Sequence, residues 1–459
     1  MKSSIKSVIL VMLIIASIYQ TSMLWFDYPS DRNFFYNIID ENSSLIVDES
    51  VVNYELFYPK QVALFGGSVN STYRLKTLSK SDDYNLAEDG ITIIQQAFSK
   101  GVEINGFIPE EKLWKGPHIL LMMPFSLTTT ILEENLSIEC DWLTESTSFE
   151  RIYIYPSTEF GNDQITVYFT DNSLATRFGV NITIGDEKQL NNSLVRYMEQ
   201  SESEDSLLYI STKLSQLDMF SEDRLLPING QYFDLLENLY GDMYFYQGEN
   251  RDNDRIKKYV DYFFINPEIV WSTEKNDVLR FGDLDAIVSY DSKGMFTYDL
   301  IKDITSKTPN LNKAYDILDS FLVKDTLLNQ VEYQLDYYEL TDTGVVFYFN
   351  YMLRGVPIVF ENMETDFEVT HPMIVSVAGN SVEKYTRLLW KSQELIIQGN
   401  PFEVRFQKPI DQLLLKYDNG NLKIKDMYLG YHISDLSDGA FLQWIVELKD
   451  GRREYYELE

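Results

Sequence analysis

Short runs of alternating apolar and polar residues recur along most of the chain, which is the pattern of half-buried β-strands. Turn signals separate neighbouring runs at 291–294, 341–344, 418–420 and 450–451. The Asp-Asn-Gly and Asp-Gly turns at the last two positions are strong signals for tight β-hairpins, so mostly antiparallel sheets are expected. Strands are predicted at 51–57, 61–65, 73–78, 118–123, 151–155, 164–170, 180–184, 278–281, 286–290, 295–298, 331–340, 345–353, 356–360, 367–379, 413–417, 422–431, 442–448 and 452–458.

Helical periodicity is confined to a few segments of the chain. The clearest is 310–322, where Leu311, Ala314 and Leu318 recur on one face of a helix. Asp89 and Gly90 are expected to open a short helix that runs through residue 98. Further helices are predicted at 191–201, 204–217, 232–239 and 255–264. Helices and strands do not alternate regularly, so the predicted fold class is α+β.

One segment near the amino terminus departs from these patterns. Residues 7–26 form an uncharged apolar run, SVILVMLIIASIYQTSMLWF, which Lys2 and Lys6 precede. At about 1.5 Å per residue this run is long enough to cross the hydrocarbon core of a bilayer as a helix. The two lysines favour a cytoplasmic end at 1–6, with the bulk of the chain outside the cell membrane. The sequence therefore predicts a single-pass membrane anchor.

A cleaved signal peptide is the alternative for this segment. Cleavage sites carry small residues two positions apart, whereas Ile14 precedes Ala16 and Gln20 precedes Ser22. The uncleaved anchor is therefore preferred.

The outer half of the predicted anchor is unusually polar. It holds Tyr19, Gln20, Thr21 and Ser22, whose side chains can form hydrogen bonds between neighbouring membrane helices. These four residues are the candidate contact with a membrane partner. The alternative is that they simply lie near the outer interface of the bilayer.

The chain has 459 residues, so the part beyond the anchor is long enough for several domains. The pattern breaks at 221–230, where SEDRLLPING interrupts the preceding periodic segments. We predict an N-terminal extracytoplasmic domain at 30–220, a central α/β domain at 221–324 and a C-terminal α/β domain at 325–459.

Charge and cysteine content exclude some classes of function. The formal net charge is −32 at pH 7, and a field of that sign repels DNA and RNA, so nucleic-acid binding is excluded. Cys140 is the only cysteine, which rules out an internal disulfide and a thiolate metal cluster. An exported domain of this size without disulfides fits a Gram-positive or anaerobic bacterial surface.

The three histidines, His118, His371 and His432, carry no recognisable catalytic pattern. None lies in a G-x-S-x-G or H-E-x-x-H setting, which nucleophilic or zinc chemistry would favour. We therefore predict no catalytic residue, no metal site and no cofactor.

Pairs of carboxylates are frequent in this acidic chain. Asp252 and Asp254 precede a predicted helix, and Asp283 and Asp285 flank a leucine between two predicted strands. A calcium loop would need a glycine and a glutamate at positions that RDNDRIKKYVDY does not supply. The expected roles are helix capping by Asp252 or Asp254 and turn formation by Asp283.

Several segments resemble the YycH regulatory family of Firmicutes. The opening KSSIKSVIL resembles the start of that family, and residues 261–270, DYFFINPEIV, resemble its F-F-x-N-P-x-x-V segment. The hairpin at 281–299 is similar to the one that follows there. Residues 424–431 resemble an I-x-D-x-x-L-G-Y stretch that YycI proteins share, and 442–446 resemble their P-x-W strand, although Gln443 stands where proline is frequent.

The resemblance implies a three-domain mixed α/β exterior that pairs with a YycI-type protein. Together the two would adjust an essential membrane sensor histidine kinase that controls cell-wall metabolism, chiefly through transmembrane helix contacts. The expected function is therefore that of a membrane-anchored, non-enzymatic regulator. The alternatives are a tethered surface-binding or protease-inhibitor-like scaffold and a wall-active hydrolase, which would also use two carboxylates.

Overall fold

The computed structural model describes residues 59–66, 72–76, 84–104, 106–128, 131–132, 148–157, 164–175, 177–183, 188–201, 208–228, 230–232, 238–247, 250–302, 309–353, 356–361, 371–393, 402–417, 422–434 and 440–458. The chain divides into the units Met1–Val51 and Val52–Glu459, and all described residues belong to the second. The predicted anchor at 7–26, the predicted strand at 51–57 and Cys140 lie outside the described residues.

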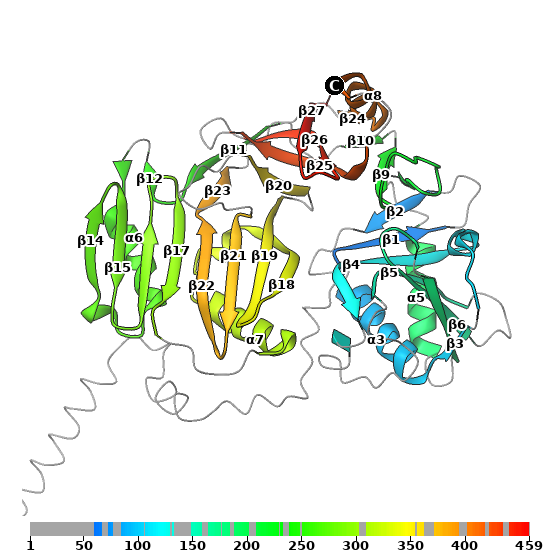
Figure 1. Ribbon diagram of the computed structural model, residues 1–459, viewed down its shortest axis with the longest axis horizontal. Coiled ribbons are helices and arrows are strands. Elements are labelled where there is room, and N and C mark those ends of the chain that lie inside the picture. Colours follow the sequence, from blue (N-terminus) through cyan, green and yellow to red (C-terminus); the bar gives the residue numbers. More distant parts are fainter. Residues whose placement is uncertain are drawn as a thin grey trace, which may run out of the picture. The chain divides into compact units, whose positions relative to one another are not determined.

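A nine-stranded antiparallel sheet forms the first part of the described chain (Figure 1). Its strands in spatial order are β3 (Val102–Glu103), β7 (Arg177–Thr183), β6 (Gln164–Thr170), β5 (Ser148–Tyr155), β4 (His118–Thr128), β1 (Gln61–Phe65), β2 (Tyr73–Lys76), β8 (Leu208–Ser211) and β9 (Leu225–Ile228). Both faces of this sheet are buried at its centre, because Ile119 and Leu121 join one apolar cluster and Leu120 joins another.

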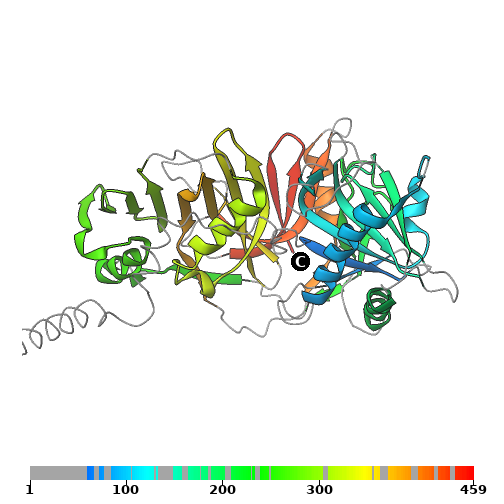
Figure 2. The same cartoon turned by 90° about the horizontal axis from the view of Figure 1, so that it is seen from below.

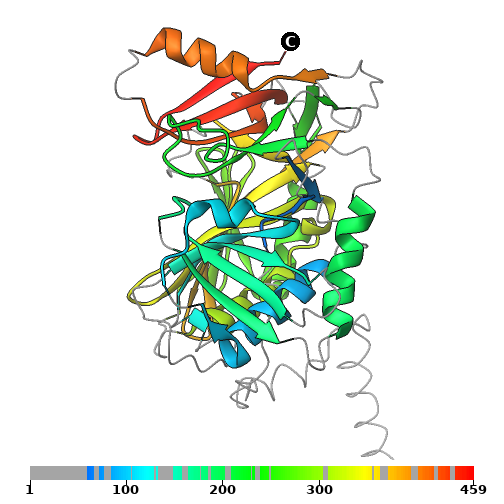
Figure 3. The same cartoon turned by 90° about the vertical axis from the view of Figure 1, so that its right-hand side faces the viewer.

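Two helices pack on this sheet. Helix α3 (Tyr84–Lys100) lies against β7, and α5 (Lys188–Ser201) lies against β1 and β4 (Figure 3). Their apolar faces are buried because residues three or four apart point to the same side of a helix. The buried side chains are Ile91, Ile94, Ala97 and Phe98 of α3 and Leu190 and Leu194 of α5.

A fourteen-stranded sheet forms the second part of the described chain. Along it lie β14 (Trp271–Lys275), β15 (Val278–Gly282), β16 (Ala286–Tyr290), β17 (Met295–Leu300), β22 (Ser381–Leu388), β21 (Met373–Ala378), β19 (Gly344–Leu353), β20 (Val356–Phe360), β25 (Ile424–Ile433), β26 (Ala440–Leu448), β11 (Asn238–Met243) and β23 (Trp390–Gln393), with β18 (Glu332–Leu340) beside β19 and β27 (Arg453–Glu457) beside β26. The β20–β25 pair is parallel and the other pairs of this sheet are antiparallel.

The remaining elements are short. Two small sheets pair β10 (Gly230–Tyr232) with β24 (Phe402–Val404) and β12 (Tyr246–Gln247) with β13 (Asn250–Arg251). The other α-helices of the described chain are α6 (Asn253–Val260), α7 (Leu311–Leu322) and α8 (Gln407–Lys416), and the 3₁₀ turns are η2 (Glu110–Trp114), η3 (Asp261–Phe263), η4 (Pro267–Ile269) and η5 (Leu328–Gln330). Helix α7 packs on β19, β21 and β22 (Figures 1 and 2).

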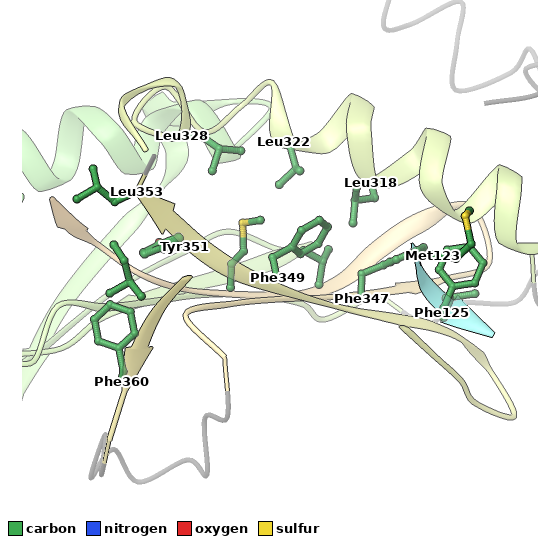
Figure 4. Packing of buried hydrophobic residues seen from close by; sticks show 14 of the residues in the cluster. Met123, Phe125, Leu318, Leu322, Leu328, Phe347, Phe349, Tyr351, Leu353 and Phe360 are labelled. Atoms are coloured by element: carbon green, nitrogen blue, oxygen red, sulfur yellow. The ribbon is translucent and has the colours of Figure 1, made fainter. Parts of the chain in front are cut away.

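The cores of the two sheets are continuous. Met123 and Phe125, at the far end of β4, lie beside Leu318 of α7 and Phe347 of β19 (Figure 4). The Phe125 ring also meets the Tyr338 ring edge-on, with centroids 4.9 Å apart. Strand β4 therefore contributes apolar side chains to both parts of the described chain.

The structure confirms the predicted α+β class with mostly antiparallel sheets. Strands are present where the sequence predicted the hairpins at 278–290, 331–353 and 442–458. Helix α7 begins as predicted, because the Asn310 side chain accepts a hydrogen bond from the Lys313 backbone N–H at 2.8 Å. The domain boundaries at 220/221 and 324/325 remain predictions.

Three predicted elements were wrong or partly wrong in type. Residues 208–211, inside the predicted helix at 204–217, form β8 because they pair with both β2 and β9. Residues 232 and 238–239, the described ends of the predicted helix at 232–239, belong to β10 and β11. Residues 413–416 of the predicted strand at 413–417 are the last turn of α8, where Ile410 and Leu413 are buried. A short apolar run fits a strand and a buried helix equally well, so distant packing decides.

The first helix is longer than predicted. Helix α3 begins at Tyr84, so Asp89 and Gly90 lie within it rather than opening it. Gly90 is buried against β4, and a Cβ atom there would lie 2.6 Å from a methyl carbon of Leu121. The glycine therefore marks a close approach of helix and sheet and not a helix boundary.

Candidate functional site

The four residues proposed to contact a membrane partner, Tyr19, Gln20, Thr21 and Ser22, lie outside the described residues. Within the described ranges, no helix combines the length and the apolar character needed to cross a bilayer. The anchor and its contact residues therefore remain predictions from the sequence.

His118 lies at the start of β4 and is completely buried. The geometry places its Nδ1 hydrogen on the Gly116 carbonyl at 3.1 Å, and its Nε2 accepts from the Tyr73 hydroxyl at 3.2 Å. Aromatic rings of Phe65 and Tyr155 lie 4.7 and 4.9 Å from the imidazole centroid. Burial lowers the pKa of His118 to about 3, against the smaller opposing effect of the Gly116 hydrogen bond. The imidazole is thus held neutral as part of an aromatic core.

This burial predicts a pH dependence of stability. Below pH 6.5 the unfolded chain protonates His118 while the folded chain does not, so the free energy of unfolding falls as pH decreases, until the folded pKa of about 3 is reached. The slope from this group approaches about 1.4 kcal/mol per pH unit. Urea titrations of the wild type and of His118→Gln between pH 7.5 and 5.0 measure it. The wild type should lose stability more steeply, and parallel curves for the two proteins would contradict the prediction.

The other two histidines are each paired with a carboxylate. His371 Nε2 lies 3.2 Å from Asp336 Oδ2, and His432 Nε2 lies 2.8 Å from Glu361 Oε2. The His432 ring also stacks on Tyr455, with centroids 3.6 Å apart. These pairs orient side chains on the sheet, and none of the hydrogen bonds described for them involves a serine hydroxyl.

The carboxylate pairs of the sequence have the expected structural roles. Asp252 caps α6, because its Oδ1 accepts from the Arg255 backbone N–H at 3.0 Å. Asp283 Oδ1 accepts from the backbone N–H groups of Asp285 and Ala286, both at 2.8 Å. In the part of the chain that the structure describes, no three His, Cys, Asp or Glu side chains gather as a metal site would require.

A completely buried ion pair joins α7 to the second sheet. Arg387 of β22 binds Asp325, which follows α7, and both side chains are 0% exposed. Tyr385 donates to Asp325 Oδ2 at 2.6 Å, and the Arg387 Nε donates to the Tyr351 hydroxyl at 3.0 Å. Burial raises the pKa of the Tyr385 hydroxyl well above its usual value, and the nearby Asp325 carboxylate adds to this shift. The hydroxyl therefore remains a neutral donor.

A second buried ion pair anchors the loop at 211–224. Arg151 Nη1 of β5 lies 2.7 Å from Asp223 Oδ2, and each side chain is 1% exposed. The other carboxylate oxygen of Asp223 accepts from Ser211 Oγ at 2.6 Å and from the Lys213 backbone N–H at 3.0 Å. The pair fixes this loop on the first sheet.

The same loop then contacts the second sheet. The backbone N–H of Ser221 donates to the Ile424 carbonyl at 2.9 Å, and the Ile424 N–H donates to the Met219 carbonyl at 2.9 Å. Arg224 Nε lies 3.1 Å from Asp426 Oδ1 of β25. These bonds join the first sheet to β25.

A further junction joins the beginning of β1 to β18. Lys60 Nζ lies 2.7 Å from Asp336 Oδ1, and the Lys60 carbonyl accepts from Gln334 Nε2 at 3.1 Å. Burial opposes ionisation of Asp336, but Lys60 and the His371 hydrogen bond outweigh it and lower the pKa of the Asp336 carboxyl. The Lys60 side chain is 42% exposed, so this pair alone contributes little stability.

The polar contacts described above therefore join the two sheets to each other and hold α7 on the second sheet. Sequence reasoning missed both buried ion pairs, since their partners lie 72 and 62 residues apart and nothing local marks them. Neither arginine stands out in the sequence, because Arg151 follows Glu150 in SFERIYIY and Arg387 lies in SVEKYTRL among other polar residues.

The chain was compared with known proteins. No protein-family profile and no curated protein matches it. A crystal structure of YycH from Bacillus subtilis matches with a TM-score of 0.52 and 15% identity, covering 88% of this chain and 98% of that chain. The C-terminal domain of Bacillus megaterium YpeB matches with a TM-score of 0.25 and 14% identity, covering 46% of this chain and 100% of that chain. The first match shows that this chain has a YycH-like fold.

Proposed function

We propose that this chain, with its YycH-like fold, is a membrane-anchored, non-enzymatic regulator of a sensor histidine kinase that controls the cell wall. It acts with a YycI-type partner through transmembrane helix contacts. The observation that carries the proposal is the match to the YycH structure over 88% of this chain. The sequence adds the uncharged apolar run at 7–26, preceded by Lys2 and Lys6. This pattern favours a cytoplasmic amino end and an extracytoplasmic location for the rest of the chain.

Such regulation needs no chemistry from the protein. A helix that packs better on one state of a two-state kinase shifts its equilibrium, and typical coupling free energies of about 1–3 kcal/mol change activity several-fold to a hundredfold. Interhelical hydrogen bonds in lipid contribute on the order of 1 kcal/mol each, so one to three such bonds from among Tyr19, Gln20, Thr21 and Ser22 reach that range. His118, His371 and His432 each have a hydrogen-bond partner within the fold, and Asp283 holds a turn, which agrees with a non-enzymatic role.

Replacing residues 7–26 by an unrelated apolar helix of equal length tests the proposal. We expect kinase output, measured with a reporter gene under its response regulator, to equal that of a strain lacking the protein. The fourfold variant Tyr19→Leu, Gln20→Leu, Thr21→Val and Ser22→Ala should approach the same output.

The matched control for this experiment replaces four apolar residues in the inner half of the anchor by leucine and should keep wild-type output. Immunoblotting of the membrane fraction confirms equal amounts of each variant. If the replaced anchor retains full regulation, the chain is a tethered binding module instead. If the purified exterior releases fragments from peptidoglycan, it is a wall-active hydrolase.

A further inference from the structure

Exposed apolar side chains are unevenly distributed over the described chain. Twelve large apolar residues are exposed there, and six of them lie between residues 262 and 301. Single exposed apolar residues are ordinary, whereas a concentration of them indicates an interaction surface. Four of the six form what we call the end patch: Ile269, Trp271, Leu284 and Ile301, exposed by 61%, 45%, 90% and 51%.

Strand pairing brings the end patch together at one end of the second sheet. Trp271, the first residue of β14, pairs with Gly282, the last residue of β15. Ile269 and Leu284 lie two residues beyond each of these positions, and the Ile301 backbone N–H donates to the Asp285 carbonyl at 2.7 Å. The four side chains therefore come from neighbouring strand ends.

The presentation of this patch is rigid. The turn that carries Leu284 is held by Asp283, which accepts two backbone hydrogen bonds of 2.8 Å. The Trp271 indole lies over Gly282, where a Cβ atom would be 2.4 Å from its Cζ2. A preorganised apolar surface binds at a lower entropic cost than a floppy one.

Strand β14 adds an open sheet edge to the patch. It is the outermost strand of the second sheet, and all five of its residues are exposed (Figure 1). In the described ranges β14 pairs with β15 alone, so its other side offers backbone donors and acceptors. Open edges of this kind accept an added strand from another protein.

The charges around the patch decide what kind of occupant it fits. Glu268 precedes Ile269, and Asp283 and Asp285 flank Leu284. Lys302 follows Ile301, and Asp299 is paired with Lys384 at 3.9 Å, so the charges not balanced in this way around the patch are mainly acidic. A second copy of this chain would bring the same acidic rim and a net charge of −32, and an anionic bilayer would also be repelled. A surface with lysine and arginine around an apolar centre is complementary.

We propose that the end patch and the open edge of β14 form a docking surface for a different protein whose contacting surface is apolar at its centre and basic at its rim. This contact lies outside the membrane-spanning segment and is separate from the proposed transmembrane contact. The partner is recognised by its charge and by strand addition, so its affinity decreases with salt concentration.

Photo-crosslinking of the full-length chain in its own cells tests the docking surface. p-Benzoylphenylalanine is placed at Leu284 or at Ile269, and at Leu415 or Leu340 as controls, which are exposed by 88% and 66% elsewhere. We expect one protein adduct from both patch positions, mapped by mass spectrometry to a Lys- and Arg-rich extracytoplasmic surface, and no such adduct from the controls. The double variant E268K/D285K should lower the adduct yield at least about tenfold. The control variant D319K, on the exposed face of α7, should leave the yield unchanged.

Several outcomes of the crosslinking would contradict the proposed docking surface. An adduct to a second copy of this chain or to lipid would do so, as would an adduct to an acidic surface. Equal adduct yields from Leu415, or no adduct at all, would also contradict it. The proposed transmembrane function is judged separately, because the anchor replacement leaves residues 268–301 unchanged. An adduct that survives that replacement supports the patch even where regulation is lost.

Discussion

Replacing Asp325 by alanine is expected to lower the free energy of unfolding by about 3–5 kcal/mol. The reason is that Arg387 keeps its charge in a place where its side chain is 0% exposed, and no other carboxylate is described within ion-pair distance. The Tyr385 hydroxyl also loses its acceptor at 2.6 Å, and an unpaired buried donor is costly. Urea unfolding followed by tryptophan fluorescence measures the loss.

Two controls separate the buried charge from lost packing. The double variant D325L/R387M removes both charges and fills similar volume, so it should recover the part of the loss that comes from the unpaired Arg387 charge, while the Tyr385 hydroxyl still lacks its acceptor. Asp450→Ala removes one partner of an exposed pair, since the Asp450 and Arg452 side chains are 52% and 57% exposed, and it should leave stability nearly unchanged. If Asp325→Ala and the double variant lose stability equally, the uncompensated charge is not the cause.

Replacing Phe125 by alanine is expected to cost about 3–5 kcal/mol, the usual loss for a buried phenylalanine. Phe125 is 7% exposed and lies in the core that β4 shares with β19 and α7 (Figure 4). The cavity would also remove the edge-on contact with Tyr338. Urea unfolding measures the total loss. Hydrogen exchange should increase at β18 and β4 more than at β26, because only the former two touch the cavity.

Phe107→Ala is the matched control for this variant. Phe107 belongs to the same part of the chain but is 82% exposed, so its loss should change stability only slightly. Phe125→Leu should have an intermediate effect, since leucine fills part of the same space. Equal results for the Phe125 and Phe107 alanine variants would show that the two sheets do not depend on this contact.

Local signals predicted much of the fold correctly. The hairpin strands at 286–298 and 442–458 are present because their turn residues favour tight reversals, as Gly294 and Gly451 show with φ values of 81° and 88°. The start of α7 at Asn310 and the cap at Asp252 were visible because a cap bonds to a backbone N–H three residues away.

The errors occurred where distant partners override local preference. Residues 208–211 became β8 through pairing with β2 and β9, and 413–416 became helical through burial of Leu413. The end patch followed the same rule. No local pattern marked its four residues as one surface, because their gathering depends on strand register.

The sequence by itself determined the α+β class, the antiparallel hairpins, the helix caps and the acidic charge, because each depends on composition or on residues a few positions apart. The tertiary structure alone decided that Arg387 meets Asp325, that Phe125 enters the core of the second sheet and that β14 is an outer edge. These features come from segments that pack together although they are distant along the chain. The free energy that selects such contacts is released only when the segments exclude water from one another.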